Sequence, residues 1–273
     1  MKLVKTLGKV SANLISRLYD ENKPVFKIDD VQRILGKGYN ESTDLLSELV
    51  KRGIVTRLKS GKFLIAPREL GSAEQYIGNW YVAAREVVNS PDYYIAFYSS
   101  MNYWGMLTQP LIKIFVASPQ RQIVPQEMKD KLVLVFVKNK FIWGVKEEWV
   151  TRDEKVRISD LEKTIIDALA HPQYCGGITE IAKGIWLTKN KIDFAKLSNY
   201  VTKYNKNVVA KRLGYILEIL NVGQRDLINE LKKYVKNRYD LFDPTLPEKR
   251  IDKNNWRLID NVGRKQILDL VWH

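Results

Sequence analysis

The sequence predicts an α+β protein, with an N-terminal winged helix-turn-helix followed by an α/β part and then a mostly helical C-terminal part. Three observations predict this class. Three helical patterns and a β-hairpin pattern come first, strand-sized apolar runs recur in the middle, and helical periodicity dominates the end. We expect a winged-helix domain over residues 1–70 and a second domain over 71–273. The second domain is expected to be α/β over about 71–158 and helical over about 159–273.

Apolar side chains recur at helical spacing in residues 9–21, 28–35 and 40–52. Gly36 follows the second of these stretches and Gly53 the third, and glycine is common just after a helix. The sequence therefore predicts three short helices in a row.

A β-hairpin is predicted next, with strands at Val55–Leu58 and Phe63–Ala66 around a turn at Ser60-Gly61. Three helices and a hairpin within about 60 residues are typical of a winged helix-turn-helix. Winged helices also bind proteins, so the topology alone does not establish DNA binding.

The middle of the chain predicts a helix at Ala73–Val88 and a buried helix with a strand-like start at Tyr93–Trp104. Four strands are expected to follow, and Asn139-Lys140 suggests a hairpin turn between the second and third of them. The expected strands are Ile112–Val116, Leu132–Val137, Phe141–Val145 and Lys155–Ile158.

From Asp160 onward the apolar spacing is helical. Residues 240–273 add two late apolar clusters, around Trp256–Ile259 and Ile267–Trp272. The expected helices are Asp160–Ala170, Ile178–Trp186, Asp193–Lys203, Val208–Leu220 and Gln224–Val235.

Basic residues outnumber acidic ones, 45 to 31, which gives a net charge of +14. Residues 1–70 carry 14 basic and 8 acidic side chains, residues 71–170 carry 12 of each, and residues 171–273 carry 19 and 11. A surplus at the two ends indicates nucleic acid or an acidic protein as partner. The alternative is a set of solvated lysines that serve solubility.

The composition also bounds the class of protein. A single cysteine, Cys175, excludes an intramolecular disulfide framework and a multi-cysteine metal site. We see no signal peptide and no apolar run near the roughly 18 residues of a membrane span. We therefore expect a cytoplasmic protein with no membrane association, no metal and no cofactor.

The predicted third helix has an apolar side, with Leu45, Leu46, Leu49 and Val50, and Ser42 falls within the same arc. The opposite side is polar and would face the major groove of DNA. We expect base contacts or phosphate contacts there and at the hairpin, from Lys37, Asn40, Thr43, Ser47, Lys51, Arg57, Lys59 and Lys62.

Two features oppose this interpretation. Asp44 and Glu48 lie on the same side of the helix and would repel phosphates, and Asn40 could cap the helix instead of reading a base. The attraction to phosphates would then come mainly from the hairpin.

Three segments of the second domain, in this order, resemble the AbiEi family of bacterial and archaeal antitoxins. They are YYIAFYSSMNYWGML (93–107), VRISDLEKTIIDALAHPQYCGGITEIAKGIW (156–186) and NVVAKRLGYILEIL (207–220), the last around Arg212-Leu213-Gly214. No single motif among them is diagnostic, and it is their ordered set that resembles the family.

The resemblance implies a gene beside that of a nucleotidyltransferase-type toxin, whose product the C-terminal domain counteracts. It implies repression of the protein's own operon through the winged helix, usually at inverted repeats, and a role in antiviral defence. Binding at an inverted repeat needs two copies, bound either as a homodimer or cooperatively. This chain departs from the family in the acidic residues on its predicted recognition helix, which oppose tight binding to an operator.

The C-terminal helices carry many cations that could bind an acidic protein or nucleic acid. As partner-binding residues we single out Lys203, Lys206, Lys211 and Arg212.

Catalysis is not expected. His171 at a predicted helix end and Cys175 lack an orienting third group, and no phosphate-binding loop or metalloprotease motif occurs. One alternative is a metal-dependent nuclease with a winged-helix targeting module, which requires Asp92, Glu127 and Lys129 to converge. Another is a purely protein-binding winged-helix adaptor, which would be favoured if the hairpin cations paired with the acidic residues of the third helix.

Overall fold

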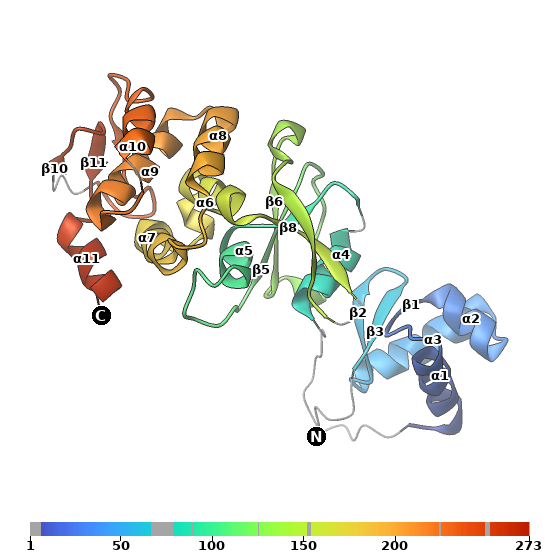
Figure 1. Cartoon of the computed structure of the whole chain (residues 1–273). Coiled ribbons are helices and arrows are strands. Elements are labelled where there is room, and N and C mark those ends of the chain that lie inside the picture. Colours follow the sequence, from blue (N-terminus) through green and yellow to red (C-terminus); the bar gives the residue numbers. More distant parts are fainter. Residues whose placement is uncertain are drawn as a thin grey trace. The chain divides into compact units, whose positions relative to one another are not determined.

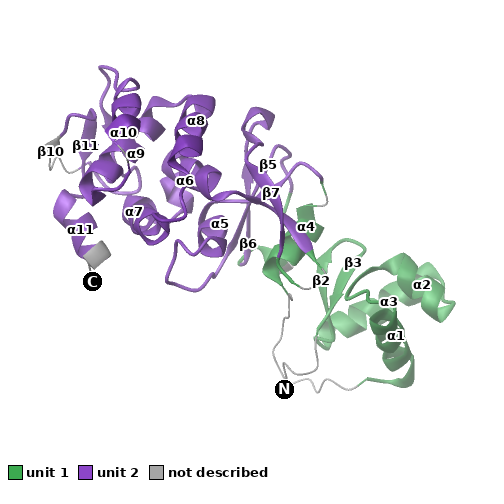
Figure 2. Ribbon diagram, viewed as in Figure 1, with its two compact units in different colours: residues 1–90, 123–130, 150–154 green, residues 91–122, 131–149, 155–273 purple. Residues whose placement is uncertain are grey.

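The computed structural model describes residues 7–66, 79–88, 90–124, 126–151, 154–223, 225–248 and 252–272. Helices and several sheets are both present, as expected for an α+β chain (Figure 1). Contacts divide the chain into two compact units (Figure 2). Unit 1 consists of residues 1–90, 123–130 and 150–154, and unit 2 of residues 91–122, 131–149 and 155–273.

The expected domain boundary at residues 70 and 71 lies outside the described residues, as does the first part of the helix expected at 73–88. Within the described part, no helix combines the length and the apolar character needed to cross a bilayer.

Unit 1 begins with three helices and a three-stranded antiparallel sheet in the order β1-β3-β2. The three predicted helices and the predicted hairpin are present, whereas β1 was not expected. The elements are α1 (Lys9–Asp20), β1 (Val25–Lys27), α2 (Ile28–Leu35), α3 (Tyr39–Lys51), β2 (Val55–Lys59) and β3 (Lys62–Ile65), and α4 (Trp80–Val88) also belongs to this unit.

Apolar side chains from every one of the first six elements meet in a core that fixes their arrangement. Phe26 of β1 stacks on Phe63 of β3 with ring centroids 5.8 Å apart. At the surface, the Arg33 guanidinium donates two hydrogen bonds to the Glu21 carboxylate and so links α2 to the end of α1.

Unit 2 contains a five-stranded mixed sheet in the order β6-β5-β4-β8-β7. Its strands are β4 (Tyr94–Ile95), β5 (Ile114–Ser118), β6 (Leu132–Phe136), β7 (Val145–Trp149) and β8 (Lys155–Ser159), and α5 (Phe97–Tyr103) follows β4. The predicted strand-like start and buried helix in residues 93–104 are confirmed by β4 and α5.

The hairpin predicted at Asn139-Lys140 is wrong. β6 and β7 lie at opposite edges of the sheet, and β7 begins only at Val145. Residues Asn139–Phe141 instead form a 3₁₀ turn, η3, whose Phe141 ring packs on Tyr204 at 4.7 Å. Because the Phe141 ring packs on Tyr204 from within this turn, residue 141 does not begin a strand as predicted.

Five of the helices that follow in unit 2 lie at predicted places: α6 (Leu161–Ala170), α7 (Gly177–Thr188), α8 (Phe194–Tyr204), α9 (Asn207–Leu220) and α10 (Arg225–Lys232). A further helix, α11 (Arg264–Trp272), covers the second late apolar cluster, which was not predicted as a helix. Short strands β9 (Asp240–Leu241), β10 (Asp252–Lys253) and β11 (Leu258–Asp260) form a small sheet that was not expected.

Helix α6 is buried almost all round, because α5, α7, α8 and α9 pack against it. Even its polar side chains Glu162, Lys163 and Asp167 are buried. A helix in this position organises the core of unit 2.

Candidate nucleic-acid interface

The inner side of α3 is set by its apolar residues. Leu46 and Leu49 are buried, Leu45 and Val50 are half-buried, and the Ser42 hydroxyl is fully buried as predicted. Before the helix, the Gly38 N–H donates to the Glu41 carboxylate over 3.3 Å. Packing and capping together determine which side of α3 faces outward.

The outward side exposes Asn40, Ser47 and Lys51, as predicted. Asn40 lies inside the first turn, and Gly38 occupies the N-cap position, so the Asn40 amide is not used as the cap. The Thr43 side chain is half-buried, and its hydroxyl donates to the Tyr39 carbonyl over 2.9 Å. Asn40 and Ser47 therefore offer free side-chain polar groups, whereas Thr43 is partly engaged.

The acidic residues near this surface are partly neutralised by their neighbours. Glu41 forms an ion pair with Lys37 at 3.1 Å, and Glu48 forms one with Arg52 at 2.9 Å. Lys37, expected as a phosphate contact, thus already has an anionic partner. Asp44 is exposed on the same side.

The hairpin cations differ from one another in exposure and in partners. Arg57 is exposed, and Lys59 is half-buried opposite Lys62 in the β2–β3 register. Partial burial lowers the pKa of Lys59, and the nearby Lys62 charge lowers it further.

Lys62 was expected to be a free cation beside the tip of the hairpin, but it is engaged with another residue. Its ammonium pairs with the Glu86 carboxylate of α4, and both side chains are mostly buried. Glu86 was not singled out in the sequence analysis, because it lies 24 residues beyond Lys62 in the chain. Of the three hairpin cations expected to contact phosphate, Arg57 is exposed and Lys59 is half-buried, whereas Lys62 is engaged with Glu86.

Two of the four cations expected to bind a partner are structural. Lys211 is 1% exposed, and its ammonium donates to the Arg238 carbonyl at 2.6 Å and to Asp240 at 2.8 Å. Arg212 is 5% exposed and donates to the Leu169 and Leu241 carbonyls. Both predictions are wrong, because α9 is surrounded by other elements and has no outer side at these positions.

Lys203 and Lys206, by contrast, are exposed. The Lys203 ammonium lies 4.7 Å from the centroid of the Trp143 ring, and Lys206 lies 5.4 Å from the centroid of Phe141. The attraction of a cation to the face of an aromatic ring helps to position both ammonium groups.

The residues of the nuclease alternative are distributed over both units. Asp92 is exposed in unit 2, Lys129 is exposed in unit 1, and the Glu127 side chain lies outside the described residues. Among the described residues, no group of three or more His, Cys, Asp or Glu side chains could hold a metal ion. Cys175 is buried, which raises the pKa of its thiol well above the ordinary value.

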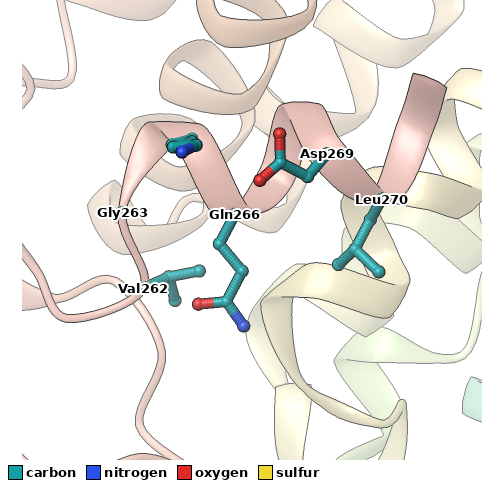
Figure 3. A pocket seen from close by; sticks show the side chains of 6 residues that line it. Val262, Gly263, Gln266, Asp269 and Leu270 are labelled. Carbon is teal, nitrogen blue, oxygen red and sulfur yellow. The ribbon is translucent and has the colours of Figure 1, made fainter. Parts of the chain in front are cut away.

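A surface depression along α11 is lined by Val262, Gln266, Asp269 and Leu270, among others (Figure 3). All of its lining residues come from α11 and the turn before it. It therefore brings no polar groups together from different elements, as a ligand site would.

No protein-family model matches the chain, and neither does any curated protein. The crystal structure of the Rv2827c protein from Mycobacterium tuberculosis is similar to the chain, with a TM-score of 0.71 at 12% identity. The similarity covers 100% of this chain and 98% of that chain. The fold therefore has a counterpart of nearly the same extent among solved structures.

Proposed function

We propose that the protein is a DNA-binding transcriptional autoregulator and an antitoxin, acting in the cytoplasm without catalysis of its own. In this proposal the first three helices and the sheet β1-β3-β2 are a winged helix-turn-helix. Helix α3 is its recognition helix, and the β2–β3 hairpin is its wing.

The observation that carries the DNA-binding part is the outward side of α3. Asn40, Ser47 and Lys51 are exposed together on a helix that directly precedes the hairpin with Arg57 and Lys59. Amide and hydroxyl groups suit base edges, and the cations suit phosphates. The ion pairs of Glu41 and Glu48 reduce the repulsion that these carboxylates would exert on DNA.

The antitoxin part rests on the resemblance of residues 93–107, 156–186 and 207–220 to the AbiEi family. The partner would be a nucleotidyltransferase-type toxin encoded by a neighbouring gene. Lys203 and Lys206 are the expected partner-binding residues that remain exposed. Two copies on an inverted repeat would repress the shared operon.

A reporter gene under the DNA upstream of the protein's own gene tests the repressor part. We expect the protein to lower reporter output and the double variant Asn40→Ala, Ser47→Ala to restore most of it. Gln173→Ala, an exposed change in unit 2, is the control and should repress normally. Full repression by the double variant at equal protein level would contradict the assignment of α3.

Growth of cells that express the neighbouring gene tests the antitoxin part. We expect that gene to arrest growth and co-expression of this protein to restore it. An arrest that co-expression leaves unchanged would contradict this part without affecting the repressor part.

A further inference from the structure

Unit 2 contains a pocket of about 270 Å³ between the segment after β6, helix α6 and the end of α8. Lys138, Lys140 and Lys206 line it with exposed side chains, while Asp167 and His171 line it from within. Pockets for small molecules have volumes of roughly 300–1,000 Å³, so this one lies just below that range.

The three lysines gather without a fixed anionic partner. In the described part of the chain, no ion pair engages Lys138, Lys140 or Lys206. Partial burial lowers the pKa of Lys206, and the charges of Lys140 and Lys138 lower it further, against a smaller opposite effect of Asp167. Like charges that repel one another at a pocket mouth would be relieved by a bound anion.

Aromatic rings stand beside these cations. Phe141 and Tyr204 line the pocket with centroids 4.7 Å apart, and Phe136 lines it with 49% of its surface exposed. The Lys140 and Lys206 ammonium groups lie 5.1 Å and 5.4 Å from the Phe141 centroid. A ligand that carries an aromatic ring next to an anionic group could contact the pocket's aromatic rings and its lysines at the same time.

The inner end of the pocket is polar, and its one carboxylate, Asp167, is already paired with a cation. Asp167 accepts a hydrogen bond from the Tyr94 hydroxyl at 3.0 Å and is paired with the buried ammonium of Lys163. Burial lowers the pKa of His171, so its ring is neutral at pH 7 and offers one donor and one acceptor. These groups can form hydrogen bonds with the edge of a nucleobase.

We propose that this pocket binds a nucleotide, with its phosphate at Lys138, Lys140 and Lys206 and its base between Phe136 and the inner pair Asp167 and His171. The ligand is either a free 5′-mononucleotide or the 5′-phosphorylated terminal nucleotide of a strand. Both present the same phosphate and base.

Calorimetric titration with the four ribonucleoside 5′-monophosphates tests the proposal. We expect at least one to bind with a Kd below about 1 mM. The double variant Lys138→Ala, Lys206→Ala should weaken it by about tenfold or more, because charge-assisted hydrogen bonds are lost. Lys191→Ala is the control, since this exposed lysine of unit 2 does not line the pocket. His171→Gln should weaken the binding of mononucleotides more than it weakens the binding of inorganic phosphate.

A 5′-phosphorylated trinucleotide and its unphosphorylated form identify the source of the ligand. Tighter binding of the phosphorylated trinucleotide than of any mononucleotide, lost in the double variant, would assign the pocket to strand ends. The reverse order would assign it to free nucleotides.

Three results would overturn the proposal: no binding of any mononucleotide at millimolar concentration, inorganic phosphate bound as tightly as every nucleotide, or an equal loss in Lys191→Ala. Melting temperatures of all variants verify that they fold. The pocket belongs to unit 2, so failure here leaves the proposed role of α3 in unit 1 untouched.

Discussion

Lysines and arginines that are close in the sequence differ in this structure, because some are exposed and others are buried. The surrounding sequence does not show which of them is buried. Lys203 lies in the last turn of α8, Lys206 follows that helix, and both are exposed. Lys211 and Arg212 on α9 are buried, and they donate hydrogen bonds to backbone carbonyls. Burial lowers the pKa of Arg212 to about 10, against weaker opposite effects of Asp243 and Asp240, so the guanidinium stays charged at pH 7. Both buried cations join α9 to the segment at residues 238–241.

Replacing Lys211 by Met should therefore destabilise the protein. The change keeps an unbranched, largely apolar side chain but removes the ammonium that donates to the Asp240 carboxylate and the Arg238 carbonyl. We expect a loss of about 2–4 kcal/mol in the free energy of unfolding, measured by urea denaturation. Lys203→Met, at an exposed position, should change it by less than about 0.5 kcal/mol. Equal effects of the two variants would contradict the structural role of Lys211.

The side chains of α3 could be assigned to its two sides from the sequence, because a single helix with one apolar stripe determines them. The buried state of Ser42 and the exposure of Asn40, Ser47 and Lys51 followed from that stripe. The burial of Lys211 and the pairing of Lys62 could not be inferred, because both depend on elements far along the chain. Lys138 and Lys140 were missed because the residues around them resembled a hairpin turn.

At the scale of elements, the pairing of Lys62 with Glu86 joins β3 to α4 within unit 1. Burial alone would raise the pKa of Glu86, but the hydrogen bond and charge of Lys62, followed by those of Arg85, outweigh it and lower the pKa. A carboxylate with a lowered pKa contributes stability above its unfolded-state pKa and loses that contribution as pH falls through its folded-state pKa.

We therefore expect the free energy of unfolding to fall as pH decreases below about 4.5, and the variant Glu86→Gln to show a smaller fall. Urea denaturation of both proteins at neutral pH and in steps down to about pH 3 measures the difference. Parallel pH dependences would show that the ion pair between β3 and α4 does not contribute.

Helix α9 approaches Trp256 so closely at Gly214 that an added Cβ would collide with the indole ring. The ring is buried, and its N–H donates to Glu218 one turn further along α9 at 2.6 Å, so it has little room to move. Gly214→Ala should therefore cost about 1–3 kcal/mol of stability despite the better helix propensity of alanine.

A double-mutant cycle with Trp256→Phe isolates this contact. The smaller ring should reduce the cost of Gly214→Ala, so the two changes should not be additive in thermal or urea unfolding. Strict additivity would mean that the glycine is needed for another reason.

Long elements were predictable from periodicity, and short ones were not. Helices α1 to α3 and α6 to α10 and the β2–β3 hairpin lie close to their predicted positions. Strands β1, β9, β10 and β11 have two or three residues, too few to show alternation, and they are defined only by their pairing with other strands. The order of the five-stranded sheet depends on long-range pairing, which spacing along the chain does not encode.

For the whole molecule, the charge distribution agrees with a division of roles between the two units. The first 70 residues and the last 103 carry the net positive charge, and the middle of the chain is neutral. The fold is shared with the Rv2827c protein at 12% identity, which shows the architecture alone. The proposed DNA reader lies in unit 1, and the proposed nucleotide pocket and partner-binding lysines lie in unit 2.

The central claim is that α3 and the hairpin bind the protein's own upstream DNA. The most direct test is a binding titration at several salt concentrations, with the upstream duplex and a scrambled duplex, for the protein and for Arg57→Ala, Lys59→Ala. We predict preference for the upstream duplex, an affinity that falls as salt rises, and a salt dependence that is shallower by about one to two released counterions in the double variant. Equal weak binding of both duplexes, unchanged in the variant, would contradict the claim.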